Sequence, residues 1–280
     1  MNLQHIKTLR EETGLGMLEV KDALNQANDD LNEARKLLQS KTTKKETNQR
    51  VASKGLTSVE VYQNEAVLFE VNAETDFVAK HPDFIKLMSE LGEVFMHSKA
   101  ITVKDALKLT INGHTVEDEI NRIGNVVKEN VYLRRFHRIK KQDHQHFETY
   151  KHQGGKLSVL LIYKDNRSIA RDIALQITSH APKYLSFESL DQETYNFEEM
   201  MLKKENPDIT TNEIKENIKN MCLLDQPFIK NPDLKVSEIL NGLTIIDFYR
   251  FELGQGIENK LNCRLDIPCD GSKITVTPIL

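Results

Sequence analysis

Asn72-Ala73-Glu74-Thr75-Asp76-Phe77-Val78-Ala79-Lys80 is the stretch in which the sequence changes from a strand pattern to a helix pattern. An apolar run over residues 66–71 precedes it, and a helix-like apolar run over residues 84–96 follows it. Strand-to-helix corners often carry function, because a rigid scaffold presents them at the surface. Thr75 or Asp76 is expected to cap the new helix, since a short side-chain oxygen accepts a hydrogen bond from an unpaired backbone N–H group.

Phe77 is an aromatic residue beside an acid at this corner, and the residue pattern leaves two interpretations open. In the first, its side chain faces the core of its own domain below a capped helix. In the second, it projects and fills a pocket of a partner protein, as aromatic anchors of interfaces do.

The residues around this corner predict an α+β domain over residues 56–140. Alternating apolar residues predict a strand at residues 59–62 and a returning strand at 66–71, joined by a polar turn. Another helix is expected over residues 116–129, and a third strand over 131–133. Because such a hairpin presents apolar side chains on one face, helices are expected to cover that face of an antiparallel sheet.

The chain from residue 141 onward repeats this plan and predicts a second α+β domain over residues 141–280, although the identity between the halves is too low to prove a duplication. An insertion at about residues 186–226 interrupts it, and Glu205-Asn206-Pro207-Asp208 breaks its helical pattern, which predicts a coiled-coil-like helical hairpin. We interpret Gln226-Pro227-Phe228 as a framework corner, because a Pro-Phe pair after a helix usually locks a chain reversal. The other predicted elements are strands at 147–150, 157–163 and 245–252 and a helix over 169–177.

Residues 1–40 predict a bundle of three short helices, whose apolar stripes can bury a core only against each other. Gly14 and Gly16 supply the turn between the first two helices. The residues alone favour a bundle that caps the larger domain, with docking on a partner as the alternative. The stripes are Leu3, Ile6 and Leu9; Met17, Val20, Ala23, Leu24 and Ala27; and Leu31, Ala34, Leu37 and Leu38.

Composition excludes several classes of protein. The 280 residues are 29% charged and 39% hydrophobic, a soluble globular balance, and the net charge of −4 argues against strong nucleic-acid binding through bulk charge. Residues 41–55 are basic without interleaved aromatic residues, which favours a solvated linker over an RNA contact. No apolar run approaches the ~20 residues that cross a bilayer, and the N-terminus lacks a secretory pattern. Cys222, Cys263 and Cys269 form no CxxC pair, so we expect a reduced, cytoplasmic protein without a membrane partner.

Several motifs resemble one known family. Thr75-Asp76-Phe77-Val78-Ala79-Lys80 resembles the signature of translation elongation factor Ts, and Thr13-Gly14-Leu15-Gly16-Met17 resembles a second signature of that family. The matches occur in family order and cover most of the chain apart from about the last twenty residues, which is more specific than any single motif. The further matches are Arg122-Ile123-Gly124, Arg134-Arg135, Gln226-Pro227-Phe228 and Phe248-Tyr249-Arg250-Phe251-Glu252-Leu253-Gly254-Gln255-Gly256-Ile257-Glu258.

The resemblance implies a guanine-nucleotide exchange factor that binds elongation factor Tu–GDP and promotes GDP release, so that GTP can reload during protein synthesis. It implies that Thr75, Asp76, Phe77 and Val78 bind this partner and dislocate its Mg²⁺ ion. Phe77 would wedge between two helices of the GTPase, Asp76 would add a polar disturbance, and Thr75 and Val78 would hold the turn.

The resemblance also implies a fold and weaker contacts. The family's N-terminal bundle is similar to a ubiquitin-associated domain and docks on the GTPase, which makes Leu15 and Met17 weaker contact candidates. His152 is another, because the family's histidine at the start of the second hairpin turn lies close to the GTPase. Some members dimerise through the coiled-coil insertion; here it is short and irregular, which argues against that contact without deciding whether the chain forms a homodimer. Residues 262–280 contain Pro and Gly and predict an irregular tail where bacterial members commonly have a helix.

No enzyme chemistry and no cofactor are indicated. There is no GxxxxGK[ST] loop, and Gly254-Gln255-Gly256 lacks the lysine that would cradle phosphate, so no direct nucleotide binding is expected. His144 and His146, with His137 and His152 nearby, could gather a metal, but their polar surroundings favour an exposed turn, and no metal is expected. No Ser–His–acid or Cys–His arrangement is recognisable.

Two other functional classes stay open. One is an adaptor that binds a partner through its N-terminal bundle and no longer exchanges nucleotide, although the intact Asp76 and Phe77 argue against it. The other is an RNA-associated role at the ribosome, which needs more basic surface than the linker offers.

Overall fold

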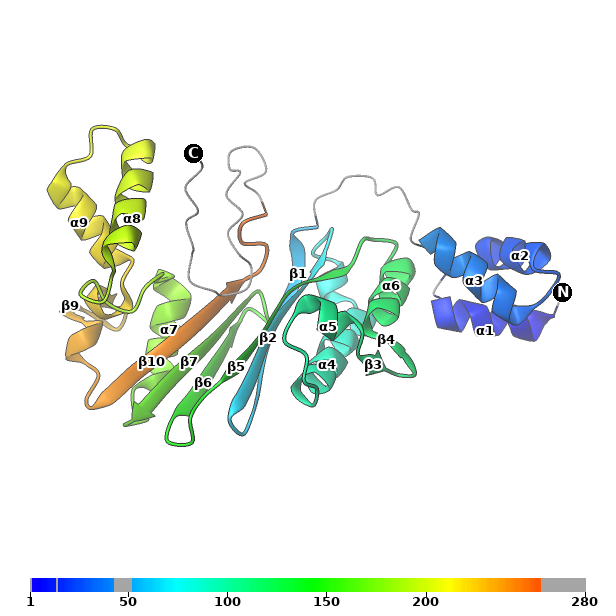
Figure 1. Cartoon of the computed structure of the whole chain (residues 1–280), viewed down its shortest axis with the longest axis horizontal. Coiled ribbons are helices and arrows are strands. Elements are labelled where there is room, and N and C mark those ends of the chain that lie inside the picture. The colour runs from blue at the N-terminus through cyan, green and yellow to red at the C-terminus, as the bar shows by residue number, and fades with distance from the viewer. Residues whose placement is uncertain (1, 14, 43–51, 258–280) are drawn as a thin grey trace. The chain divides into compact units, whose positions relative to one another are not determined.

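The computed structural model describes residues 2–13, 15–42 and 52–257 of the chain, which Figure 1 draws in colour. The described part contains the predicted corner, the first predicted half and the second as far as Ile257, whereas Gly14, the middle of the basic linker and the predicted tail with Cys263 and Cys269 lie outside it. The chain divides into two compact units. Unit 1 is Met1–Ile139, Gly154–Lys156 and Phe251–Leu280, and unit 2 is Lys140–Gln153 and Leu157–Arg250.

The N-terminal part of unit 1 is helical, with α1 (Leu3–Thr13), α2 (Met17–Gln26) and α3 (Leu31–Thr42). Met17, expected in the apolar stripe of α2, is instead 48% exposed. It is the first residue of α2, and the buried stripe of this helix begins one turn later, at Val20. The buried residues of this cluster are Ile6, Leu9, Leu15, Val20, Ala23, Leu24, Ala34 and Leu38.

The sheet of unit 1 is built on the predicted hairpin. Strand β1 (Lys54–Tyr62) pairs antiparallel with β2 (Glu65–Ala73), and the register Tyr62↔Glu65 leaves a tight loop in which Gln63 adopts φ 52°. Strand β5 (Tyr132–Lys140) completes the order β1-β2-β5, so β2 lies in the middle. The hairpin prediction is confirmed, with strands longer than their apolar cores.

Helices α4 (Pro82–Met96), α5 (Val103–Leu107) and α6 (Val116–Val127) share one core with this sheet (Figure 1). That core holds alternate residues of β2, namely Val67, Phe69, Val71 and Ala73, as a strand packed by helices on one face requires. The other face of β2 is also buried, because Ala66, Leu68, Glu70 and Asn72 are each 0% exposed. The expectation of one covered face was therefore too simple for β2. A short antiparallel pair, β3 (Thr110–Ile111) and β4 (His114–Thr115), precedes α6.

Unit 2 has the order β10-β7-β6, made by β6 (His146–His152), β7 (Leu157–Asp165) and β10 (Leu243–Glu252). Helix α7 (Ala170–His180) packs against β6 and β7. Strands β6 and β7 pair antiparallel from His146↔Tyr163 to His152↔Leu157, and Tyr163 is among the largest fully buried side chains of the described residues. Mixed helices and antiparallel sheets confirm the predicted α+β class.

The predicted insertion contains α8 (Gln192–Glu205) and α9 (Thr211–Asn220), which contact each other. Glu198 fixes α8, because its buried carboxylate accepts hydrogen bonds from Lys183 Nζ (2.9 Å) and Tyr184 Oη (2.7 Å). Burial, reinforced by this carboxylate, raises the pKa of Tyr184, so the phenol stays protonated and donates.

The Gln226-Pro227-Phe228 corner is built into unit 2 as framework. Gln226 is 2% exposed, and its Nε2 donates to the Asn220 carbonyl oxygen at 2.7 Å. Phe228 packs in the core of unit 2, and β8 (Pro227–Phe228) pairs with β9 (Asn231–Lys235). The framework interpretation of this corner agrees with these contacts.

Candidate functional site

The Phe77 turn, defined as residues 74–80, joins the end of β2 to α4. The chain leaves β2 at Ala73, passes through a bend, and forms the short 3-10 helix η1 (Val78–Lys80). Val78 is 3% exposed and belongs to the core of unit 1, and Ala79 beside it is also buried. The turn is therefore anchored from below by its own apolar residues.

Two carboxylates hold the start of the turn. Glu129, just beyond α6, accepts hydrogen bonds from the Thr75 N–H group (2.8 Å) and from the Thr75 hydroxyl (2.5 Å). Glu74 accepts a bond from the N–H group of Asn130 at 3.1 Å. The chain reversal at Lys128, with φ 60°, brings this segment alongside the turn. Hydrogen bonds to a charged group are worth more than neutral ones, so the backbone at Thr75 is well fixed.

Phe77 projects from this fixed turn. Its side chain is 85% exposed, the largest value for a large hydrophobic side chain among the residues that the structure describes. The interpretation in which Phe77 packs into its own core is wrong. An aromatic side chain held outward on a fixed turn is free to fill a pocket of another protein, which is the second of the two interpretations.

The expectation that Thr75 or Asp76 caps the following helix is also wrong. Helix α4 begins at Pro82, and His81 is its N-cap, accepting a hydrogen bond at Nδ1 from the Asp83 N–H group at 3.3 Å. Proline suits the first position of a helix, and the residue before a proline is restricted to extended backbone, as His81 is with ψ 131°. Pro82 thus sets the start of α4 and leaves Phe77 in a separate turn.

Asp76 is the polar neighbour of Phe77 and is half exposed, with 52% of its side-chain surface accessible. Its Oδ1 lies 3.9 Å from Nζ of Lys156, whose side chain is 48% exposed. A pair this exposed contributes little to stability. It places the Lys156 ammonium group beside the Asp76 carboxylate.

We expect Thr75→Val to loosen the turn without disturbing its apolar anchors. The substitution keeps the shape but removes the hydroxyl that donates to Glu129, so the free energy of unfolding should fall by about 1–2 kcal/mol. Urea denaturation measures this loss, and Thr75→Ser, which retains the hydroxyl, should recover most of it. An unchanged unfolding free energy in Thr75→Val would show that the Glu129 contact does not hold the turn.

The weaker candidates lie outside this turn. Leu15 is 7% exposed and packs in the N-terminal helical core, whereas Met17 and its neighbour Leu18 are exposed by 48% and 77%. His152 ends β6 in unit 2, is partly buried, and its Nδ1 lies 3.4 Å from Oη of Tyr150. The residues from Thr75 to Val78 therefore lie together on one turn, and the other candidates belong to other parts of the chain.

In the portion of the chain that the structure describes, no group of three or more His, Cys, Asp or Glu side chains is placed to hold a metal ion. No helix in that same portion has the length and apolar character needed to cross a membrane.

The Phe77 turn lies in a stretch of the chain that is similar to known proteins. The family model described as Elongation factor TS matches residues 74–255, which is more than half of the chain. The chain is also 39% identical over 277 residues to elongation factor Ts of Acholeplasma laidlawii (strain PG-8A), an alignment that covers 92% of this chain and 94% of that protein. The chain belongs to the elongation factor Ts family. The family match begins at Glu74, so it contains the whole Phe77 turn, and it ends at Gln255.

In this elongation factor Ts chain, sequence reasoning missed Glu129 and Lys156 beside the Phe77 turn and Leu18 in the N-terminal helices. Glu129 and Lys156 have the appearance of solvated surface charges, and nothing in a single sequence pairs them with Thr75 and Asp76. Leu18 was missed because it lies off the apolar stripe of α2, although its 77% exposure gives it more accessible surface than Met17 has. Charged side chains whose partners are distant in sequence leave no periodic signal.

Proposed function

We propose that this chain is a guanine-nucleotide exchange factor that binds elongation factor Tu–GDP and promotes GDP release, after which GTP reloads. It performs no covalent chemistry of its own and binds no nucleotide directly. The observation that carries the proposal is Phe77, 85% exposed on a turn whose neighbours Thr75 and Val78 are fixed. Membership of the elongation factor Ts family supplies the partner and the reaction, and it does not favour a non-exchanging adaptor.

An exchange factor must bind the nucleotide-free GTPase more tightly than the nucleotide-bound form, because the coupling between two ligands is reciprocal. Phe77 supplies that preference if the pocket that it fills on the GTPase opens only when the GTPase helices near the Mg²⁺ and phosphate site move apart. Burying the phenyl group contributes about 2–3 kcal/mol, which offsets part of the cost of separating packed helices. Asp76 adds a negative charge near a site that holds phosphate and Mg²⁺, while Thr75 and Val78 keep the turn in place.

Other parts of the chain add contacts in this proposal. The helices of residues 1–40 act as a ubiquitin-associated-like bundle that docks on the GTPase through Met17 and Leu18, with Leu15 supporting that surface from the bundle core. His152 lies at a further contact. Residues 41–55 link the bundle to core subdomains at 56–140 and 141–280, the second carrying the helical hairpin at about 186–226. The factor works in the cytoplasm.

The test is release of a fluorescent GDP analogue from the cognate elongation factor Tu, followed by stopped flow over a range of factor concentrations. We expect the release rate to rise with factor concentration and to saturate, because the factor acts through a complex with the GTPase. Binding is measured in parallel with the same proteins. A folded chain that binds elongation factor Tu without accelerating release would contradict exchange and support the adaptor.

A further inference from the structure

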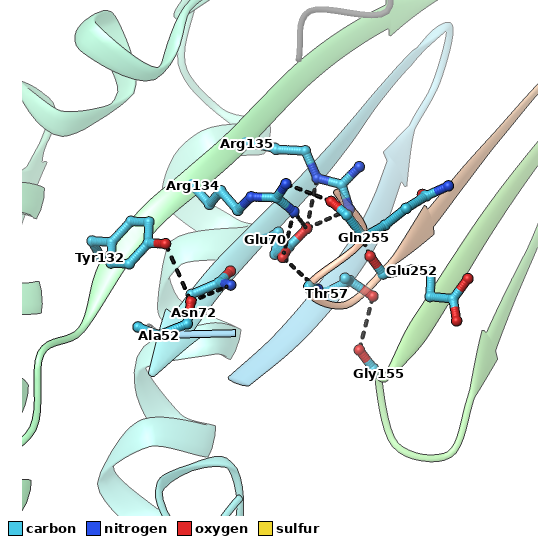
Figure 2. A network of polar contacts seen from close by, with 11 residues as sticks. Ala52, Thr57, Glu70, Asn72, Tyr132, Arg134, Arg135, Gly155, Glu252 and Gln255 are labelled. Carbon is cyan, nitrogen blue, oxygen red and sulfur yellow. Dashed lines mark hydrogen bonds and ion pairs between the residues drawn. The ribbon is translucent and has the colours of Figure 1, made fainter. Parts of the chain in front are cut away.

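Two family motifs outside the Phe77 turn, Arg134-Arg135 and the motif that contains Gly254, contact the same buried glutamate. Glu70 on β2 is 0% exposed and lies between Arg134 and Arg135 of β5 (Figure 2). Arg134 Nη1 donates to Glu70 Oε1 at 3.0 Å, and Arg135 Nε donates to Glu70 Oε2 at 2.6 Å. A buried carboxylate needs such partners, because an unpaired buried charge is costly.

The same groups bind the backbone of residues 252–255, at and just beyond the end of β10. The N–H group of Gly254 donates to Glu70 Oε1 at 2.9 Å. Arg135 Nη2 donates to the carbonyl oxygen of Glu252 at 2.8 Å, and Arg134 Nη2 donates to that of Gln255 at 2.5 Å. Gly254 has φ 72°, and a Cβ there would lie 2.5 Å from the Ser53 carbonyl oxygen, so only glycine fits. Gly254 and Gln255 of the Gly254-Gln255-Gly256 run thus take part in this network, which we call the Glu70 network.

The Glu70 network in turn fixes the Gly154–Lys156 segment of unit 1. The N–H group of Leu253, inside the bound segment, donates to the Lys156 carbonyl oxygen at 2.9 Å. On the other side, the Gly155 carbonyl oxygen accepts bonds from the Thr57 N–H group (2.7 Å) and the Thr57 hydroxyl (2.8 Å), as Figure 2 shows. The backbone of Lys156 is therefore held between β1 and residues 252–255.

Lys156, which this anchored backbone carries, forms an ion pair with the Phe77 turn through its Nζ and Asp76 Oδ1. Among the described residues, no other cation forms an ion pair with this turn. We propose that Lys156 is a positioning residue for nucleotide exchange: its ammonium group holds the Asp76 carboxylate beside Phe77, and the Glu70 network fixes the segment that carries Lys156. The inference rests on the proposed exchange function. Lys156 acts through Asp76 and does not itself need to touch the GTPase.

The experiment measures kcat/KM for release of the fluorescent GDP analogue from elongation factor Tu with Lys156→Ala, Asp76→Asn and the double variant. We expect Lys156→Ala to lower kcat/KM by about twofold to fivefold, the size typical of a half-exposed ion pair. Lys156→Arg should restore it, and the defect should shrink in about 0.5 M salt, where exposed charges are screened. The double variant should be no slower than Asp76→Asn, because the two side chains act as one unit.

Lys104→Ala is the matched control, since Lys104 is an exposed lysine of α5 and not a residue of the Phe77 turn, and it should behave as the native chain does. Native kinetics in Lys156→Ala, or additive defects in the double variant, would overturn the positioning role while leaving exchange intact. Failure of the native chain itself to accelerate release would instead remove the proposed function and, with it, this inference.

Discussion

The Phe77→Ala variant is expected to accelerate GDP release from elongation factor Tu about 30- to 150-fold less effectively than the native chain, while unfolding at the same temperature. Burial of the phenyl group on docking is expected to stabilise the exchange transition state by about 2–3 kcal/mol. Each 1.36 kcal/mol corresponds to a factor of ten in rate. Because Phe77 is 85% exposed, its removal leaves no cavity in the free protein. Stopped-flow measurement of kcat/KM and a thermal unfolding curve check both halves of this expectation.

A matched control separates the wedge from a general loss of apolar surface. Ile101 is 70% exposed and lies outside the turn, so Ile101→Ala removes a comparable exposed group and should leave exchange and unfolding unchanged. Phe77→Leu, which keeps apolar bulk without the ring, should fall between the native chain and Phe77→Ala. Exchange by Phe77→Ala within twofold of native would retain the function and assign it to other contacts.

The orientation of Phe77 could not be predicted, because the local sequence is compatible both with a side chain that faces the core and with one that projects. In an uninterrupted helix, Phe77 would lie seven residues before Phe84 and share its buried face. Pro82 prevents this by fixing the start of α4, and Val78 takes the core position instead. The decision thus depends on how one proline divides the segment, a detail that apolar periodicity does not contain.

The hairpins could be predicted because their signal is local. Apolar side chains on both sides of Gln63-Asn64 and of Gln153-Gly154-Gly155, with polar or glycine residues between them, specify strand, turn and strand. The short pair β3 and β4 was not predicted, since Thr110–Ile111 and His114–Thr115 are too short to show alternation. The length of the alternating apolar pattern, more than its composition, therefore determined which strands could be predicted.

The Glu70 network shows what a single sequence omits. Glu70 stands in an apolar strand where a glutamate is expected on a solvated face, yet it is fully buried. Its partners lie 64 residues away at Arg134 and 184 residues away at Gly254. The motifs Arg134-Arg135 and Phe248 to Glu258 indicated the family from sequence, but their shared contact became visible only in three dimensions. The fold class was therefore predictable, while the support of the site was not.

Removal of the Glu70 carboxylate is expected to be the most destabilising single change considered for this chain. In Glu70→Ala, Arg134 and Arg135, whose side chains are only 13% and 11% exposed, lose the acid between them, and the Gly254 N–H group loses its acceptor. Removing one member of a buried charge set costs about 3–5 kcal/mol, because the remaining charges stay buried and uncompensated. Urea unfolding should report a loss of this size, and exchange by the still-folded protein should fall as it does in Lys156→Ala.

The arginines provide the internal test of that explanation. If uncompensated charge is the cause, Glu70→Ala should cost much less in a background that already carries Arg134→Leu and Arg135→Met, because no buried cation then remains at this place. Glu93→Ala on the exposed side of α4 is the matched glutamate control and should change the unfolding free energy by less than about 0.5 kcal/mol. A loss in Glu70→Ala as small as that control would mean that the segment at residues 252–255 is held by its backbone contacts alone, and Lys156 would then keep its place beside Asp76 without the buried acid. The same large loss with and without the arginines would contradict the uncompensated-charge explanation and assign the loss to the lost hydrogen bond with the Gly254 N–H group.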